Sequence, residues 1–99
     1  MIIYCVTVNI DDSIREEWLK WMKESHIPDV MRTGCFTGNR LLKLLVNEES
    51  GTSYSIQYSC KTMEDFNRYQ KEFASTLQQE HREKYKDKFV AFRTLLEEV

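Results

Sequence analysis

Two histidines, His26 and His81, are the residues best suited to acid–base chemistry in this sequence, and His26 has a carboxylate nearby. Asp29 follows His26 by three positions, and a carboxylate beside an imidazole can orient it as a general base. The same residues also have a structural interpretation, because histidine is favoured in the last turn of a helix. Pro28 followed by Asp29 is common turn chemistry. The sequence favours the structural role and keeps His26 and Asp29 as candidate catalytic residues.

The three cysteines, Cys5, Cys35 and Cys60, indicate neither a disulfide framework nor a zinc site. They are odd in number and have no CxxC spacing. Buried thiols in a reducing cytoplasm are the simplest interpretation. A nucleophilic pair of Cys35 with His26 could form only through folding. The histidines lack metal-ligand spacing, and no glycine-rich phosphate loop is present, so we predict no metal and no cofactor.

The distribution of charge excludes several classes of partner. The 99 residues carry a net charge of −2, and the two signs are interspersed. Duplex nucleic acid is therefore not an expected partner. The first ten residues are apolar but alternate, without the positive leader of a signal peptide. No apolar run approaches the roughly eighteen residues of a membrane span. We expect a single cytoplasmic domain over residues 1–99 that binds neither nucleic acid nor membrane.

The N-terminal third predicts a strand followed by a helix. Residues 2–10 alternate so that one face is fully apolar, which is typical of a strand with one face in the core. Ser13 or Asp12 can then cap a helix. Its apolar residues fall within one arc and include Trp18 and Trp21, which we place in the core. The residue before a proline avoids helical geometry. The helix is therefore expected to end at Ile27, with residues 28–34 as a connector.

The rest of the chain predicts two strands, a helical region and a last strand. The first strand covers Cys35–Val46 and the second covers Ser53–Cys60, whose alternation is the clearest in the chain. Thr62 and Asp65 resemble a capping box at the start of a helical region that extends to about Tyr85. The pattern allows a break near residues 74–75. Residues 89–99 form the fourth strand.

The predicted order is β-α-β-β-α-β, which is the ferredoxin-like α+β pattern. Right-handed crossovers give one four-stranded antiparallel sheet with strands 1 and 3 central and both helices on one face. The other face would show a mixture of apolar and polar side chains: Ile3, Cys5, Thr7, Asn9, Ser55, Gln57 and Ser59, with Leu41 and either Phe92 or Arg93 from the edge strands. Such a face suits neither open water nor a dry core. We therefore predict a homodimer of paired sheets enclosing a cavity, with ligand-binding candidates Asn9, Arg40, Ser55, Gln57 and Arg93.

Four segments resemble a family of small uncharacterised bacterial proteins within the dimeric α/β-barrel superfamily. They are "EEWLKWMKESHIPDVMRTGCF", "YSIQYSC", "MEDFNRYQ" and "KFVAFRTLLEEV", and together with the intervening sequence they cover nearly the whole chain. The family is common in Bacteroidetes-like genomes and is named only as a domain of unknown function. The resemblance implies the dimeric barrel fold and carries no reaction with it. The wider superfamily includes oxygenases, haem-degrading enzymes, isomerases and effector-binding domains, so fold does not select a function.

The resemblance also suggests a set of candidate catalytic residues: Asn9, Tyr69 and His81. Haem-degrading members of the superfamily use an asparagine on the first strand, a tryptophan on the second helix and a later histidine. This chain has Asn9 at the expected place, but Tyr69 replaces the tryptophan and His81 lies one residue too far along. The two departures argue against haem chemistry. His81 is more simply interpreted as a solvated helix residue.

The sequence therefore predicts a homodimeric module with a small-molecule cavity between its paired sheets. One alternative is a small metal-independent enzyme of the oxygenase or isomerase type. Another is a protein-interaction domain.

Overall fold

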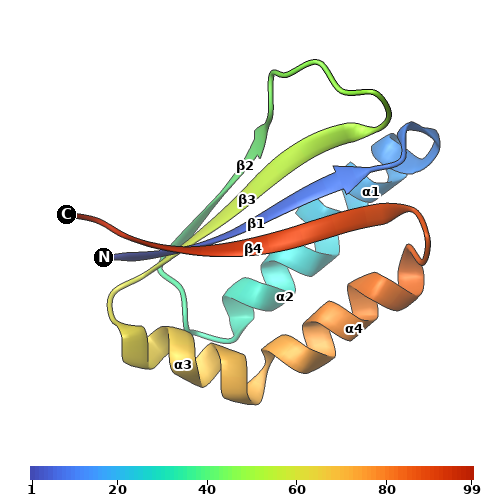
Figure 1. Cartoon of the computed structure of the whole chain (residues 1–99). Coiled ribbons are helices and arrows are strands. Elements are labelled where there is room, and N and C mark those ends of the chain that lie inside the picture. The colour runs from blue at the N-terminus through green and yellow to red at the C-terminus, as the bar shows by residue number, and fades with distance from the viewer.

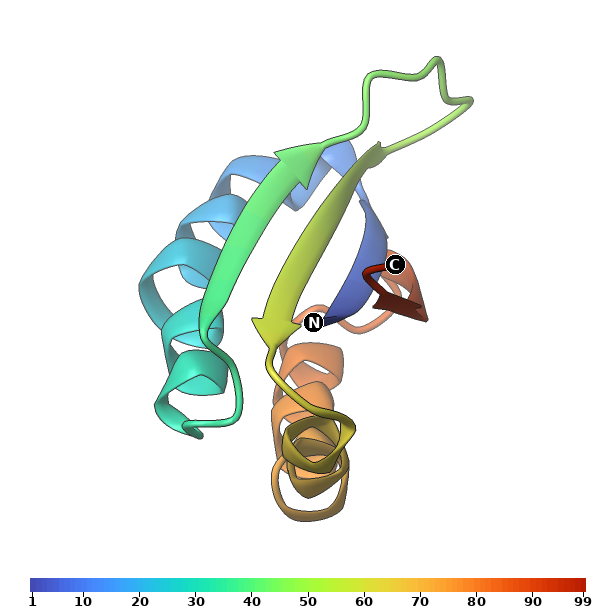
Figure 2. The same ribbon diagram turned by 90° about the vertical axis from the view of Figure 1, so that its left-hand side faces the viewer.

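The computed structural model describes residues 1–99 and contains one four-stranded antiparallel sheet in the order β2-β3-β1-β4. The strands are β1 (Ile2–Ile10), β2 (Gly38–Lys43), β3 (Thr52–Cys60) and β4 (Phe89–Glu97). The helices lie below and behind the sheet in Figure 1, and Figure 2 shows both helical segments on one side of it. This arrangement confirms the predicted ferredoxin-like α+β fold. We call the face of the sheet without helices the open face.

The helical layer consists of two segments that cross the sheet. The first contains a short 3₁₀ turn η1 (Asp12–Ile14), α1 (Arg15–Trp21), a π-helical turn η2 (Met22–His26) and α2 (Ile27–Arg32). The second contains α3 (Met63–Glu72) and α4 (Ala74–Lys84). None of them combines the length and the apolar character needed to cross a membrane.

The first helical segment does not end at Ile27, as the sequence predicted, but continues through Pro28 to Arg32. The π turn explains the continuation. The Ile27 N–H bonds to the carbonyl of Met22, five residues earlier, so the hydrogen-bond ladder shifts before it reaches the proline. Pro28 then stands in the first turn of α2, where a missing N–H is tolerated. The residues expected to form a connector are therefore mostly helical.

The helix termini agree partly with the sequence. Thr62 caps α3 by accepting a hydrogen bond from the Asp65 N–H at 3.2 Å, as predicted. The second segment breaks at Phe73, whose φ of −126° is not helical, and this confirms the break near residues 74–75. The N-terminal cap of the first segment is Asp11, which accepts from the Ser13 N–H. It replaces the predicted caps Asp12 and Ser13.

Even-numbered residues of β1 and β3 face the helices and form the core with Trp18. The Trp18 side chain is 0% exposed and lies 5.2 Å from the Tyr54 ring, centroid to centroid. Trp21 is only half-buried and packs at the edge of the core. The predicted core role of Trp18 is therefore confirmed.

Strand β2 is shorter than the predicted Cys35–Val46, because the chain enters it only at Gly38. Cys35 and Phe36 are buried ahead of the strand, where Phe36 packs on Tyr69 at 4.9 Å. Leu41 pairs with Ile56 and therefore faces the helices, whereas the sequence placed it on the open face. Arg40 pairs with Gln57 and lies on the open face, as expected.

The register of β4 places Arg93 on the helix side, which corrects its assignment to the open face. Arg93 pairs with Val6, and Phe92 pairs with Thr7. Because Val6 faces the helices and successive side chains alternate, Arg93 points toward the helices and Phe92 toward the open face. The sequence alone allowed either Phe92 or Arg93 on the open face, because the choice depends on the strand register.

Candidate functional site

The most enclosed polar site is a pocket between the sheet and the helical layer, with a volume of about 40 Å³. That volume holds about three water molecules. Val6, in the middle of the central strand, remains half-buried because it faces this pocket. Ten of its fourteen lining residues are hydrophobic when the tyrosines are counted with them. Its polar groups are the hydroxyls of Tyr4, Tyr58 and Tyr69 and the side chains of His26, Gln78, His81 and Arg93.

Three elements bring polar groups together around the Tyr4 hydroxyl at one side of this pocket. Arg93 on β4 donates from Nε to the Tyr4 oxygen at 3.1 Å. Gln78 on α4 donates from Nε2 to the same oxygen at 3.5 Å. Burial raises the pKa of Tyr4, and the charge of Arg93 partly offsets this effect. Tyr4 is therefore a neutral hydroxyl next to a guanidinium.

His81 lies in the pocket wall and is buried, so the prediction that it is solvated is wrong. Its Nε2 accepts a hydrogen bond from the Trp18 indole N–H at 2.9 Å. The ring also stands perpendicular to Phe89 at 4.3 Å. An imidazole that accepts at Nε2 carries its proton on Nδ1 when neutral. His81 therefore supplies the hydrogen-bond acceptor that the buried Trp18 N–H requires.

His26 is positioned by the π turn and stacks on Trp21, with ring centroids 5.0 Å apart. Its ring lies 5.7 Å from His81. The Nδ1 atom of His26 is buried and has no hydrogen-bond partner. An unpartnered polar atom of this kind is rare in a folded protein and requires an explanation. π turns are frequent at functional sites.

Both imidazoles are neutral at physiological pH. Burial lowers the pKa of His26 to about 4, with Asp29 acting in the opposite direction and Arg93 adding to the decrease. Burial, together with the charges of His26 and Arg93, also lowers the pKa of His81 to about 4. Of the two rings, His26 has a nitrogen without a partner, whereas the acceptor nitrogen of His81 is already bonded to Trp18.

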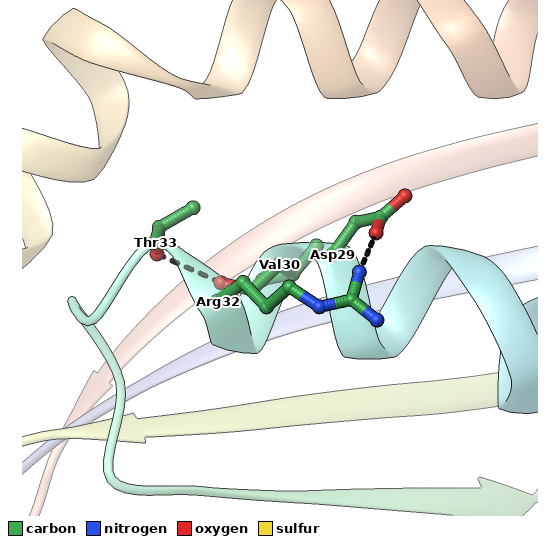
Figure 3. A network of polar contacts seen from close by, with 4 residues as sticks. All are labelled: Asp29, Val30, Arg32 and Thr33. Carbon is green, nitrogen blue, oxygen red and sulfur yellow. Dashed lines mark hydrogen bonds and ion pairs between the residues drawn. The ribbon is translucent and has the colours of Figure 1, made fainter.

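Asp29 does not orient His26 by a hydrogen bond, as the sequence suggested. Figure 3 shows its carboxylate paired with the guanidinium of Arg32 on the next turn of α2. In the same view the Thr33 hydroxyl donates to the Val30 carbonyl at 2.7 Å and closes the end of the helix. Asp29 acts on His26 only through its charge.

The haem-related candidates Asn9, Tyr69 and His81 do not form one site. Asn9 lies on the open face, where its amide donates to the Glu48 carboxylate at 2.8 Å and to the Ser53 hydroxyl at 3.2 Å. Tyr69 and His81 line the pocket on the other side of the sheet. Asn9 instead anchors the β2–β3 loop.

The five predicted ligand-binding residues are also divided by the sheet. Asn9, Arg40, Ser55 and Gln57 lie on the open face, and only Arg93 lines the pocket. On the open face, Ser55 and the Cys5 sulfur are 3.1 Å apart. Nothing in the sequence singled out Tyr4 and Gln78. The only available signal was that Tyr4 brings a hydroxyl into an otherwise apolar row.

Several solved structures share this fold at low sequence identity. A dimeric ferredoxin-like protein from an uncultured marine organism is 15% identical with a TM-score of 0.71, covering 99% of this chain and 96% of that one. A putative antibiotic biosynthesis monooxygenase from Bordetella bronchiseptica is 16% identical, with a TM-score of 0.61 and coverages of 99% and 97%. A mutant of MhuD with manganese protoporphyrin IX bound is 20% identical, with a TM-score of 0.62 and coverages of 100% and 94%.

These likenesses establish the ferredoxin-like fold alone. No curated protein matches the sequence. A family model matches residues 1–99, and the chain belongs to the family described as Domain of unknown function (DUF4286).

Proposed function

We propose that the chain binds a small, partly apolar molecule carrying a carboxylate or a similar oxyanion, in the pocket between the sheet and the helices. The observation that carries this proposal is the position of Arg93. Its guanidinium has no carboxylate within ion-pair distance and donates to the Tyr4 hydroxyl beside an apolar pocket. Arg93 therefore does not line the cavity that the sequence predicted on the open face, and that cavity lacks its positive charge.

The chemistry of the lining supports an anionic ligand. A guanidinium presents several donors in one plane and binds carboxylates by paired hydrogen bonds. Tyr4 and Gln78 supply further polar groups next to Arg93, while ten of the fourteen lining residues are hydrophobic. Arg93 itself is exposed, so the pocket reaches solvent beside it. The carboxylate would lie at Arg93 and the apolar part against the sheet.

A carboxylate that binds here should raise the melting temperature, and the Arg93→Met variant should lose that increase. A ligand at one hundred times its Kd stabilises the folded state by about 2.7 kcal/mol. Thermal melts with acetate and propionate measure the effect. Arg40→Met is the matched control, because it removes the same charge from the open face. A screen of small acids that shifts no melting temperature contradicts the proposal, and so does an unchanged shift in Arg93→Met.

We also propose that the protein forms a homodimer through its open face. Val90 and Phe92 on β4 are 73% and 62% exposed, and Leu96 is 46% exposed on the same face. A monomer rarely exposes apolar side chains in such a row unless the surface binds a partner. The structural neighbour described as dimeric adds support from the fold.

Light scattering of the wild-type protein at micromolar concentration should give about twice the chain mass of 11.9 kDa. Phe92→Glu should reduce the measured mass toward that of one chain, because it buries a charge in the interface. Met63→Glu is the control, since Met63 is 41% exposed at the start of α3, outside the open face. A soluble wild-type monomer contradicts the dimer. A stoichiometric partner of another kind would favour the protein-interaction alternative.

The enzymatic alternative would use the same pocket. The neutral His26 ring, with its unpartnered Nδ1, is suited to accept a proton from a bound substrate. Arg93 and Tyr4 would then stabilise the resulting anion. This is the observation that keeps a metal-independent enzyme of the isomerase or oxygenase type as the second candidate.

A further inference from the structure

The pocket contains a cation and two neutral imidazoles that influence one another. Arg93 lies close enough to His26 and His81 for its charge to disfavour the protonated form of both rings. All three line the same space of about 40 Å³. A bound anion would offset the positive charge of Arg93 beside the two histidines.

We propose that the pocket binds its anion together with one proton and that His26 takes up this proton from solvent. The inference rests on the proposed anion site and adds a property to it. The ligand A⁻ and a solvent proton enter as a pair, so the occupied pocket contains the anion between the Arg93 guanidinium and the His26 imidazolium. The anion and the proton taken up with it together correspond to the neutral form of a weak organic acid.

His26 is better placed than His81 to take up the proton. The Nε2 atom of His81 already accepts from Trp18, and protonating that atom would break a buried hydrogen bond. His26 has a buried Nδ1 without a partner, so its protonation breaks no bond. The nearby Asp29 carboxylate also favours the charged form of His26. A bound carboxylate would supply the missing acceptor or counter-ion.

The other groups that face the histidines do not compete for this proton. Burial raises the pKa of Tyr4, Tyr58 and Tyr69, so these hydroxyls stay neutral well above physiological pH. The titratable and charged groups around the two rings come from every element packed against them: Tyr4 on β1, Tyr58 on β3, Tyr69 on α3, Lys84 and Tyr85 at the end of α4, Arg93 on β4, and Asp29 on α2. The two histidines are the neutral bases that line this pocket.

Binding and protonation are then coupled in both directions. Burial is the main cause of the lowered pKa of His26, and Arg93 adds to it. A bound anion offsets the charge of Arg93 and gives the protonated ring a counter-ion, so it raises the pKa of His26. By reciprocity a lower pH strengthens anion binding. The affinity should rise by up to about tenfold per pH unit over the range in which His26 titrates in the complex. An anion site made by an arginine alone has no such dependence.

Calorimetric titration with propionate at pH 5.5 and pH 7.5, in buffers of different ionisation enthalpy, tests this coupling. We expect a Kd several-fold lower at pH 5.5, with proton uptake approaching one per site. His26→Gln should bind propionate with an affinity that no longer depends on pH and without proton uptake. His81→Gln is the matched control and should keep the uptake, since glutamine still offers an oxygen to the Trp18 N–H.

Histidine ring NMR on the unmodified protein gives a second measurement that does not depend on the variants folding. Saturating propionate should raise the pKa of His26 from about 4 to about 6.5, the value that uptake close to one proton at pH 5.5 requires. An unchanged His26 pKa in the complex, or uptake that persists in His26→Gln, overturns the inference and leaves the anion site intact. If neither propionate nor acetate binds the wild-type protein at either pH, the proposed function is overturned, and the proton coupling with it.

Discussion

Replacing Trp18 with alanine should reduce the free energy of unfolding by about 3–5 kcal/mol, as truncations of large buried aromatic residues do. The Trp18 side chain is fully buried and packs on Tyr54, so alanine leaves a cavity in the middle of the helix–sheet interface. The substitution also removes the N–H that donates to His81. Because small domains are stable by only about 5–15 kcal/mol, this single change removes a large fraction of the stability.

Trp18→Phe separates the two contributions, because phenylalanine keeps an aromatic ring but has no N–H. It should cost clearly less than Trp18→Ala. Leu19→Ala is a control at the adjacent, half-buried position, where less apolar surface is lost. Urea unfolding at a fixed protein concentration measures all three variants. If Trp18→Ala is as stable as wild type, the packing described for α1 against β3 is wrong.

The fold was predictable because the central strands carry a clear binary pattern. From Ile2 to Ile10 in β1 and from Tyr54 to Cys60 in β3, every second residue is apolar and lies on one face, so this face is the one expected against the helices. Thr62 and the break at Phe73 were also recognisable, since capping depends on residues close in sequence. Local rules sufficed at these two places, whereas the equally local cap of the first helical segment is Asp11 and not the predicted Asp12 or Ser13.

The end of the first helix and the face of Arg93 were predicted wrongly for two different reasons. Pro28 disfavours helical geometry at Ile27, but the π turn shifts the hydrogen bonds and the helix continues. Arg93 was assigned to the wrong face because adjacent residues on a strand alternate, so an uncertainty of one position reverses the side. The pairing of Phe89 with Ile10 determines this register, and it joins residues that are far apart in the sequence.

Most of the candidate site could not be predicted from the sequence, because it also depends on contacts between residues that are far apart in the chain. His81 was expected in solvent because its neighbours in the sequence are charged, yet its own turn of α4 packs on Phe89 and Trp18. Tyr4, Gln78 and Arg93 come from three separate elements, and only folding brings them together. His26 was identified from its residue type, but its relationship to Arg93 was not.

Acidification from pH 7 to pH 4.5 should destabilise the protein strongly through His26 and His81. Their pKa values are about 4 in the folded state, against 6.5 for an ordinary histidine. Below pH 6.5 the unfolded chain therefore binds more protons than the folded one, and acid favours unfolding. The stability contributed by each neutral ring is complete above pH 6.5. It falls by about 1.4 kcal/mol per pH unit as the pH decreases toward 4.

Urea unfolding at pH 7.5, 6.5, 5.5 and 4.5, at one protein concentration, measures this dependence. His26→Gln and His81→Gln should each remove about half of the slope between pH 6.5 and pH 4.5, and the double variant should be nearly flat there. Asp11 also has a lowered pKa, because Ser13 donates to its carboxylate. Its effect begins only at lower pH, since the ordinary value for aspartate is 3.8. A wild-type stability that is constant from pH 6.5 to pH 4.5 would show that the imidazoles are not held neutral by burial.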